Sequence, residues 1–247
     1  MINFITGNKF KEIANDHLDQ DKTYVDLNSK PKIIFVKTDY LPKFKQSILP
    51  DIDYSFKLIT HNSDIGVYEC DFDLLNDTRL IQWFGMNCHV EHEKLTPIPI
   101  GIANAQWPHG DEDLLRKVSS LSIPKKDRIY CNFDPNTNIL RRSILNDLQD
   151  NPIVDIQSNS LDQEGYWRTL ASYKYVISPP GNSIDCHRIW ESLYLGTIPI
   201  CLTHISLKAF EELPIIFKKT YQDLQLPLTK IKSSCDMSSM SYWKNII

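Results

Sequence analysis

The sequence predicts an α/β fold of two small domains whose parallel sheets face each other across a cleft. Short β-branched and aromatic runs alternate with helical patterns along most of the chain. This alternation occurs twice, and the proline-punctuated stretch 120–127 separates the two series. A chain of 247 residues is long enough for two small domains. We therefore expect an N-terminal domain over residues 1–122 and a C-terminal domain over residues 123–247, whose last helix packs back on the first domain.

The start of the first domain shows little helical or strand periodicity. Residues 1–30 are polar, and 26–31 is typical of a loop. Beyond them, β-rich runs predict strands at Lys32–Thr38, Ser55–Thr60 and Leu95–Ile102. The two prolines of the last run make it an edge strand or a short one. Helical spacing and capping residues predict helices at Tyr40–Leu49, Thr78–Phe84 and Asp111–Ser119.

The second domain shows a clearer alternation of strands and helices. Its predicted strands are Arg128–Phe133, Ile153–Ile156, Tyr175–Ile177, Ile198–Leu202 and Pro214–Phe217. Its predicted helices are Asn136–Asp150, Gln163–Ser172, one that Asp185 caps and Gly196 ends, and a terminal helix containing Trp243.

Residues 173–204 form the unit around which the second domain is organised. The loop Ser178-Pro179-Pro180-Gly181-Asn182 interrupts a buried strand, and its prolines and glycine predict a fixed, tight turn. A helix and a further strand follow. A loop that opens onto a helix N-terminus favours anions such as phosphate, because unpaired N–H groups and the helix dipole both point at the ligand.

Polar residues occupy the first turns of this helix. Arg188 can bind a diphosphate through its two-pronged guanidinium, and Glu191 lies on the same face, where it can accept from ribose hydroxyls. In the alternative interpretation, Arg188 and Glu191 form a solvated pair on the helix surface and His187 is merely polar. Spacing alone leaves both interpretations open.

The segment S-P-P-G-N-S-I-D-C-H-R-I-W-E-S-L-Y-L-G-T-I-P-I, residues 178–200, resembles the C-terminal signature of exostosin-like glycosyltransferases. Two departures concern Pro180, which stands where many members carry arginine, and Ser183, which stands where they often carry glycine. The phosphate contact of that arginine must then fall to Arg188 or be missing. The positions in register with the signature include Gly181, Asp185, Arg188, Glu191, Gly196 and Pro199.

The resemblance implies a compact GT-B enzyme, in which two Rossmann-like domains face a cleft and the C-terminal one holds most of the donor. It implies transfer of a sugar from a nucleotide sugar, such as a UDP-sugar, to a hydroxyl of a glycan or another acceptor. We expect the transfer to invert the anomeric carbon and to need neither a metal nor another cofactor. The residues expected to bind the donor are Ser178, Gly181, Asn182, Ser183, Asp185, His187, Arg188 and Glu191.

Inversion requires a base that takes the proton of the acceptor hydroxyl. Polar residues follow two predicted strands of the first domain, at the edge where open α/β sheets bind ligands. The expected catalytic candidates there are Asp64, His61 and His109. Trp107, beside the last of them, is the aromatic residue that we consider as a stacking surface for a sugar.

Composition narrows the choice of partners. A formal net charge of -4 argues against a nucleic-acid binder that depends on a basic field, and the pair Arg141-Arg142 is interpreted as solvated surface. No apolar run approaches a membrane span, and residues 1–5 lack the core of a secretory signal, so we expect a cytoplasmic protein. The six cysteines show no C-x-x-C spacing and are expected to be reduced.

Two other functions stay open. Asp71 and Asp73 form a D-x-D triplet, which in GT-A transferases holds a divalent metal and the donor diphosphate. An acidic residue at position 71 also suits a helix N-terminus. The second alternative is a non-catalytic module that binds a glycan or a nucleotide. Neither a G-x-G-x-x-G nor a Walker A motif is present.

Overall fold

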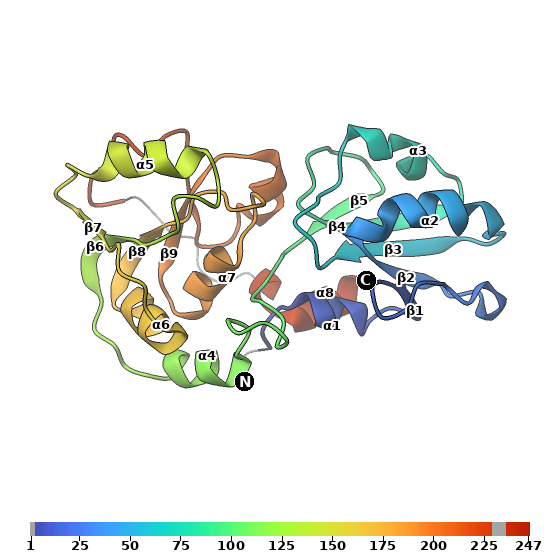
Figure 1. The fold of residues 1–247 in the computed structure, drawn as a ribbon, viewed down its shortest axis with the longest axis horizontal. Coiled ribbons are helices and arrows are strands. Elements are labelled where there is room, and N and C mark those ends of the chain that lie inside the picture. The colour runs from blue at the N-terminus through green and yellow to red at the C-terminus, as the bar shows by residue number, and fades with distance from the viewer. Residues whose placement is uncertain (1–2, 229–235) are drawn as a thin grey trace.

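The computed structural model describes residues 3–228 and 236–247 of the chain. Two five-stranded sheets lie side by side, and the strands of each pair in parallel (Figure 1). The predicted α/β class with two parallel halves is confirmed, and the arrangement is consistent with two Rossmann-like halves. Within the described ranges, no helix has the length and apolar character needed to cross a membrane.

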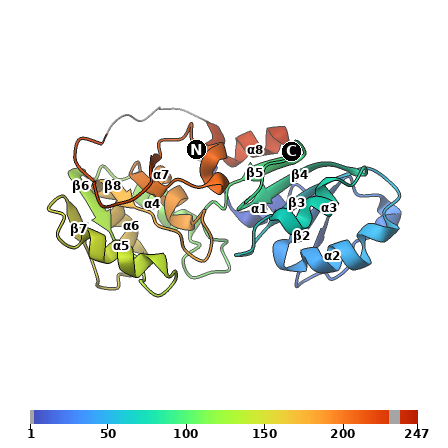
Figure 2. The ribbon, with the colours of Figure 1, turned by 90° about the horizontal axis from the view of Figure 1, so that it is seen from above.

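The first sheet follows the chain in the order β1-β2-β3-β4-β5, so β5 lies at an edge, where Pro97 is tolerated. Helices α2 and α3 cover one face, and α1 and α8 cover the other (Figures 1 and 2). The strands are β1 (Asp16–Leu18), β2 (Ile33–Lys37), β3 (Phe56–His61), β4 (Leu80–Met86) and β5 (Leu95–Ile98). The helices are α1 (Gly7–Lys11), α2 (Leu41–Ser47), α3 (Phe72–Leu75) and α8 (Met240–Ile246).

The second sheet has the order β10-β9-β8-β6-β7. The chain moves outward from β6 to β7 and then returns to build β8, β9 and β10 on the other side, so the direction reverses between β6 and β8. Such a reversal is a topological switch point, where open parallel sheets bind ligands. Its strands are β6 (Lys126–Cys131), β7 (Val154–Ile156), β8 (Tyr173–Ile177), β9 (Ile198–Leu202) and β10 (Ile216–Lys218), and its helices are α4 (Glu112–Ser119), α5 (Leu140–Leu148), α6 (Gln163–Ala171) and α7 (His187–Tyr194).

One buried cluster connects the two halves. It contains Phe10 and Ile59 from the first half and Trp167 and Trp190 from the second, together with Trp243 of α8. Two further clusters each stay within one half, on the faces covered by α2 and by α5. The halves are therefore joined by a continuous apolar core, and the boundary between residues 122 and 123 stays a prediction.

The prediction of a helix at Thr78–Phe84 is wrong, because Leu80–Met86 form strand β4 between β3 and β5. Trp83 is fully buried and donates its indole N–H to the Thr60 hydroxyl of β3 at 2.9 Å. Ile81, in the same strand, is 53% exposed. Neighbouring strands on both sides satisfy the backbone of β4, and its aromatic residues suit a sheet that is covered on both faces.

The first thirty residues contain two elements that their polar composition did not reveal. Helix α1 begins after Thr6, whose hydroxyl accepts from the Lys9 N–H at 3.3 Å, and β1 pairs with β2. These elements have five and three residues, too few to show a period in the sequence.

Candidate functional site

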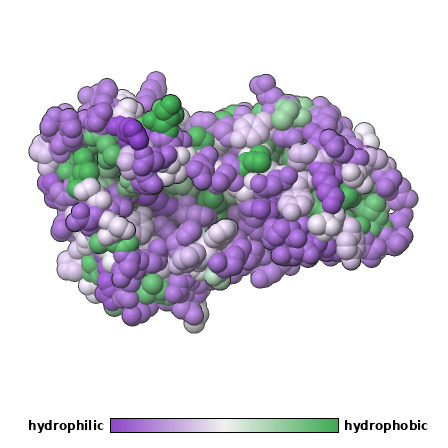
Figure 3. All heavy atoms as spheres, viewed as in Figure 1, coloured by the Kyte–Doolittle hydropathy of each residue, from purple (hydrophilic) through white to green (hydrophobic). Residues whose placement is uncertain are grey.

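A cavity of about 1340 Å³ opens where the carboxyl edge of the first sheet faces the second half. Residues that end or follow each of the five strands line it, among them Asp19, Lys37, His61, Met86 and Ile100. The second half contributes Asn182 and His187. Figure 3 shows that the hollow between the two halves is mainly hydrophilic. The strand ends of a parallel sheet are the usual place for a ligand, so this cavity is the first candidate site.

His61 lies in the cavity wall but has no free nitrogen. It is 2% exposed, its Nε2 donates to the Pro99 carbonyl oxygen at 3.0 Å, and its Nδ1 accepts from the Asn62 N–H at 2.7 Å. Burial lowers the pKa of His61 to about 4, so the ring is neutral at pH 7. We therefore assign His61 a positioning role, which leaves Asp64 and His109 of the three candidate bases.

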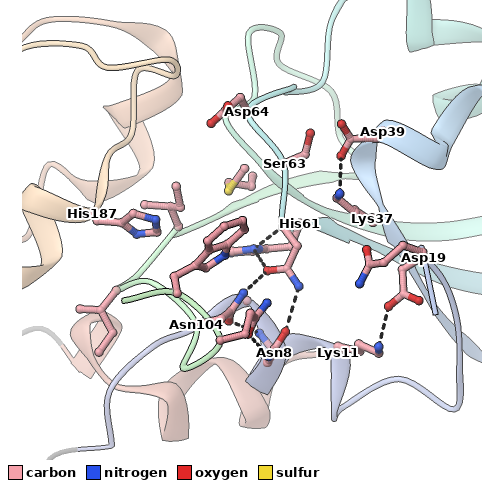
Figure 4. A pocket seen from close by; sticks show the side chains of 18 of the residues that line it. Asn8, Lys11, Asp19, Lys37, Asp39, His61, Ser63, Asp64, Asn104 and His187 are labelled. Carbon is pink, nitrogen blue, oxygen red and sulfur yellow. Dashed lines mark hydrogen bonds and ion pairs between the residues drawn. The ribbon is translucent and has the colours of Figure 1, made fainter. Parts of the chain in front are cut away.

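Asp64 bridges the two halves at the top of the cavity (Figure 4). Its Oδ2 accepts from the Asn182 side-chain amide at 3.1 Å, and its backbone oxygen accepts from the Ser183 hydroxyl at 2.7 Å. The fold thus brings together three residues that the sequence placed on opposite sides of a cleft. The carboxylate is exposed, and within residues 3–228 and 236–247 its Oδ1 accepts no hydrogen bond, so this oxygen can take a further partner.

His187 reaches the cavity from the first turn of α7 (Figure 4). Its Nδ1 donates to the Gly101 carbonyl oxygen at 2.8 Å, which leaves Nε2 as an acceptor. Burial and the neighbouring His109, whose ring centre lies 6.0 Å away, lower the pKa of His187, and Asp64 opposes them. The ring is therefore neutral at pH 7 and can accept a proton from a ligand hydroxyl.

Asp185 and Ser178, which were expected to bind the donor, are buried structural residues instead. Cys186 precedes α7 as its N-cap, so the prediction that Asp185 caps this helix is wrong. Asp185 is 1% exposed, and its two oxygens accept from the Ile100 N–H and the Trp190 indole N–H, both at 2.8 Å. Ser178 is 3% exposed, and its hydroxyl lies 3.5 Å from the Cys186 sulfur.

We expect Asp185→Asn to destabilise the fold by about 1–3 kcal/mol although the two side chains have the same shape, because the new amide group would face one of two donors and leave it unpaired. The measurement is urea unfolding at pH 7, with the exposed Asp147→Asn as the matched control. Equal stability of both variants would contradict the assignment.

The pH profile provides a second check of Asp185. Burial raises its pKa to about 7, from a model-compound value of 3.8. The folded protein thus holds this proton more tightly than the unfolded chain does. The resulting stabilisation is complete below pH 3.8 and is lost as the pH rises through 7. In Asp185→Asn, the free energy of unfolding is expected to lack this decrease between pH 3.8 and pH 7.

A second cluster of polar side chains, Arg141 and Arg188, lies on the other side of the Pro180–Asn182 loop, at the switch point between β6 and β8. Arg141 of α5 donates from Nε to the Pro180 carbonyl oxygen at 2.8 Å. The guanidinium carbons of Arg141 and Arg188 lie 5.3 Å and 6.0 Å from the centre of the Phe133 ring. Two cations therefore lie close to the same aromatic ring, and Arg141 also lies beside Gly181.

Neither of these arginines lies within ion-pair distance of a carboxylate in the part of the chain that the structure describes. Arg79, Arg128 and Arg168 each form an ion pair, whereas Arg141 and Arg188 form none among the described residues. Arg141 is 5% exposed, and the Nε of Arg188 is buried without a hydrogen-bond partner. Burial and the charge of Arg188 lower the pKa of Arg141. Buried positive charge of this kind is costly, and a bound anion would offset that cost.

Glu191 lies one helical turn from Arg188, and it is 5% exposed. Burial raises its pKa to about 7, and the charge of Arg188 opposes this shift. At pH 7 the side chain therefore balances only part of the charge of Arg188. The interpretation of Arg188 and Glu191 as a solvated pair on the helix surface is wrong, because both side chains point into the protein.

Apart from the buried Ser178 and Asp185, the residues expected to bind a donor lie in different places. Asn182 and His187 line the cavity, and Ser183 lies beside them through Asp64. Arg188 and Glu191 lie on the Phe133 side and do not line it. The Gly181 N–H is already bonded to the Ser183 carbonyl oxygen at 2.8 Å, so this amide is not available to a ligand.

Arg141 was missed, since the pair Arg141-Arg142 was interpreted as solvated surface. That is correct for Arg142, which is exposed, and wrong for Arg141. The signal was present: Arg141 precedes Ile144 by three residues and Leu148 by seven, which places it on the apolar face of α5. An arginine on a buried helix face is a candidate ligand group.

The D-x-D triplet lies away from this site. Lys45 Nζ is 3.3 Å from Asp71 Oδ1 and 2.7 Å from Asp73 Oδ1, so one ammonium group already pairs with both carboxylates. Asp71 also accepts from the Tyr68 N–H at 3.0 Å, as a residue at a helix N-terminus does. Among the described residues, no group of three or more histidine, cysteine or acidic side chains converges as metal ligands do.

Comparisons with known proteins add no relative to this picture: no protein-family model matches the chain, and a search of curated proteins finds no match.

Proposed function

We propose that this protein is a glycosyltransferase that moves a sugar from a nucleotide sugar to a hydroxyl acceptor, with the two halves arranged as in the GT-B fold. The observation that carries the proposal is the convergence of Arg141 and Arg188 at the switch point of a parallel sheet, where neither forms an ion pair with a described carboxylate and Glu191 balances only part of the charge of Arg188. A nucleoside diphosphate carries negative charge, which would pair with the two positively charged guanidinium groups. The adjacent cavity, lined from both halves, offers room for the sugar and the acceptor.

In this proposal the two arginines bind the diphosphate and stabilise the negative charge that builds on it as it leaves. Arg141 compensates for the arginine that Pro180 replaces, because its Nε reaches the Pro180 carbonyl oxygen at 2.8 Å. Glu191, one helical turn from Arg188, accepts a hydrogen bond from a ribose hydroxyl through its carboxylate.

The transfer step follows from the position of Asp64. The acceptor oxygen attacks the anomeric carbon while its proton passes to the Asp64 carboxylate. The bond between the anomeric carbon and the phosphate oxygen breaks, and the nucleoside diphosphate leaves with the electron pair. Attack from the face opposite to the leaving group inverts the anomeric carbon. The Asn182 amide holds the carboxylate in place through Oδ2.

The direct test is a panel of UDP-, GDP- and ADP-sugars, scored for release of the nucleotide with and without a chelator. We expect one or more donors to be hydrolysed slowly with water as acceptor, at a rate that the chelator leaves unchanged, because the arginines supply the positive charge. Arg188→Ala is expected to lose donor binding, with Arg142→Ala as the control.

Each other result points to a named alternative. Loss of release with chelator and recovery with manganese would favour a metal-dependent transferase. Binding of a donor without release would indicate a non-catalytic module. Absence of both binding and release across the panel would overturn the proposal.

A further inference from the structure

We infer that the cavity contains an acceptor subsite for a neutral sugar, formed by four side-chain amides and by Trp107, which lines the same cavity. The amides belong to Asn8, Asn62, Asn104 and Gln106, and we call them the amide floor. The inference names the acceptor class of the proposed transferase and so depends on that proposal for its biological meaning. Binding of a sugar to the amide floor can be measured without any nucleotide.

The amide floor is held rigidly by its own hydrogen bonds (Figure 4). Asn104 Oδ1 accepts from the Asn8 backbone N–H at 2.8 Å, and Asn104 Nδ2 donates to Asn62 Oδ1 at 2.9 Å. Asn62 Nδ2 donates to Asn8 Oδ1 at 3.1 Å, which closes a ring of three residues. Asn8 Nδ2 then donates to Gln106 Oε1 at 3.1 Å. The orientation of each amide is fixed before any ligand arrives.

The backbone beneath the floor is adapted to it. Asn62 has a left-handed backbone with φ of 60°, which an asparagine tolerates better than most residues do. A Cβ atom at Gly7 would lie 1.8 Å from Asn62 Oδ1, so only glycine leaves room for this amide. His61 holds Asn62 from the other side through the bond between the Asn62 N–H and its Nδ1.

Trp107 gives the floor an apolar wall. It is 56% exposed, unlike the other tryptophans named above, which are buried in the core. A β-turn fixes its backbone, since the Trp107 N–H donates to the Asn104 carbonyl oxygen at 2.9 Å and the Gly110 N–H donates to the Trp107 carbonyl oxygen at 2.9 Å. An exposed indole beside oriented amides matches a pyranose, which has an apolar C–H face and hydroxyls around its rim.

The charges of the cavity select against an anionic ligand. Five carboxylates and two lysines line it, which leaves the wall negative. The lysines are already paired, Lys11 with Asp19 at 2.5 Å and Lys37 with Asp39 at 3.5 Å. A phosphate or an acidic peptide would therefore be repelled, whereas a neutral polyhydroxylated ligand needs only the amides and the indole.

The test uses methyl glycosides of glucose, galactose, mannose, xylose and fucose, without nucleotide, and saturation-transfer NMR as the readout. We expect binding of one or more of them, and an affinity about tenfold lower in Trp107→Ala, since a stacked ring contributes about 1 kcal/mol or more. Gln106→Ala is expected to weaken binding too. Tyr24→Ala removes an aromatic ring that is 64% exposed outside the cavity, and Gln222→Ala removes an exposed amide elsewhere, so both should bind as the wild type does.

The outcomes separate this inference from the proposed function. Binding of a glycoside that depends on Trp107 supports the subsite, even if no nucleotide sugar is turned over. Absence of glycoside binding, or equal binding by Trp107→Ala and Tyr24→Ala, overturns the subsite, even if a nucleotide sugar is hydrolysed. Thermal unfolding of each variant shows that the fold is retained.

Discussion

Asp64→Asn is expected to slow sugar transfer about 10²- to 10⁴-fold while nucleotide binding stays unchanged. The amide cannot take the proton of an acceptor hydroxyl, yet its oxygen can still accept from the Asn182 side chain, so the bridge between the halves is kept. The rate of transfer at saturating donor, compared with the dissociation constant of the free nucleotide, checks this expectation.

Asp39→Asn provides the matched control, because Asp39 lines the same cavity but is 3.5 Å from Lys37 and has no contact with the second half among the described residues. It should transfer at nearly the wild-type rate. Full activity of Asp64→Asn would refute its role as the base. His109, the other remaining candidate, and His187, whose Nε2 can accept a proton, would then be the next residues to replace.

Arg141→Ala is expected to weaken the binding of a nucleoside diphosphate about 10- to 100-fold. A hydrogen bond to a charged group contributes about 1.5–3 kcal/mol, and the Arg141 guanidinium, which is buried, has already lost most of its hydration in the folded protein. Arg142→Ala removes the neighbouring charge, which is exposed and donates to Asn136 Oδ1 at 2.5 Å. Calorimetric titration of both variants with UDP, GDP and ADP compares a buried arginine with a solvated one.

Arg141 also supports the loop, because it donates to the Pro180 and Asp134 carbonyl oxygens at 2.8 Å and 3.0 Å. Arg141→Lys separates the two roles, since it keeps the charge and loses the two-pronged geometry. We expect this variant to bind more tightly than Arg141→Ala and more weakly than the wild type. Equal nucleotide affinity of Arg141→Ala and Arg142→Ala, with both variants folded, would exclude Arg141 from the site.

The sequence determined the architecture because strand and helix patterns are local. The β-rich runs near residues 33, 56, 129, 175 and 198 became parallel strands, since each carries enough apolar side chains to be buried on both faces. The Pro179-Pro180-Gly181 turn and the helix after it also followed from short-range rules. Strand β4 did not, because its aromatic residues are compatible with a helix until neighbouring strands pair with its backbone.

The candidate site was predicted in part. Asp64, Asn182 and Ser183 were named from the sequence, and the fold places them in contact. Spacing places Arg141 on the apolar face of α5, but it does not give the partners of Asp185 and Arg141, because each partner lies far along the chain. The Ile100 N–H lies 85 residues from Asp185, and the Pro180 carbonyl lies 39 residues from Arg141.

By itself, then, the sequence determined two parallel α/β halves and a polar loop at a strand end. Only the tertiary structure decided which charges are buried. It turned Asp185 inward as a support between the halves, and it turned Arg141 inward beside Arg188. The physical reason is that the free energy of a charged group depends on the water and the partners around it, and these are set by residues that meet only when the two halves fold together.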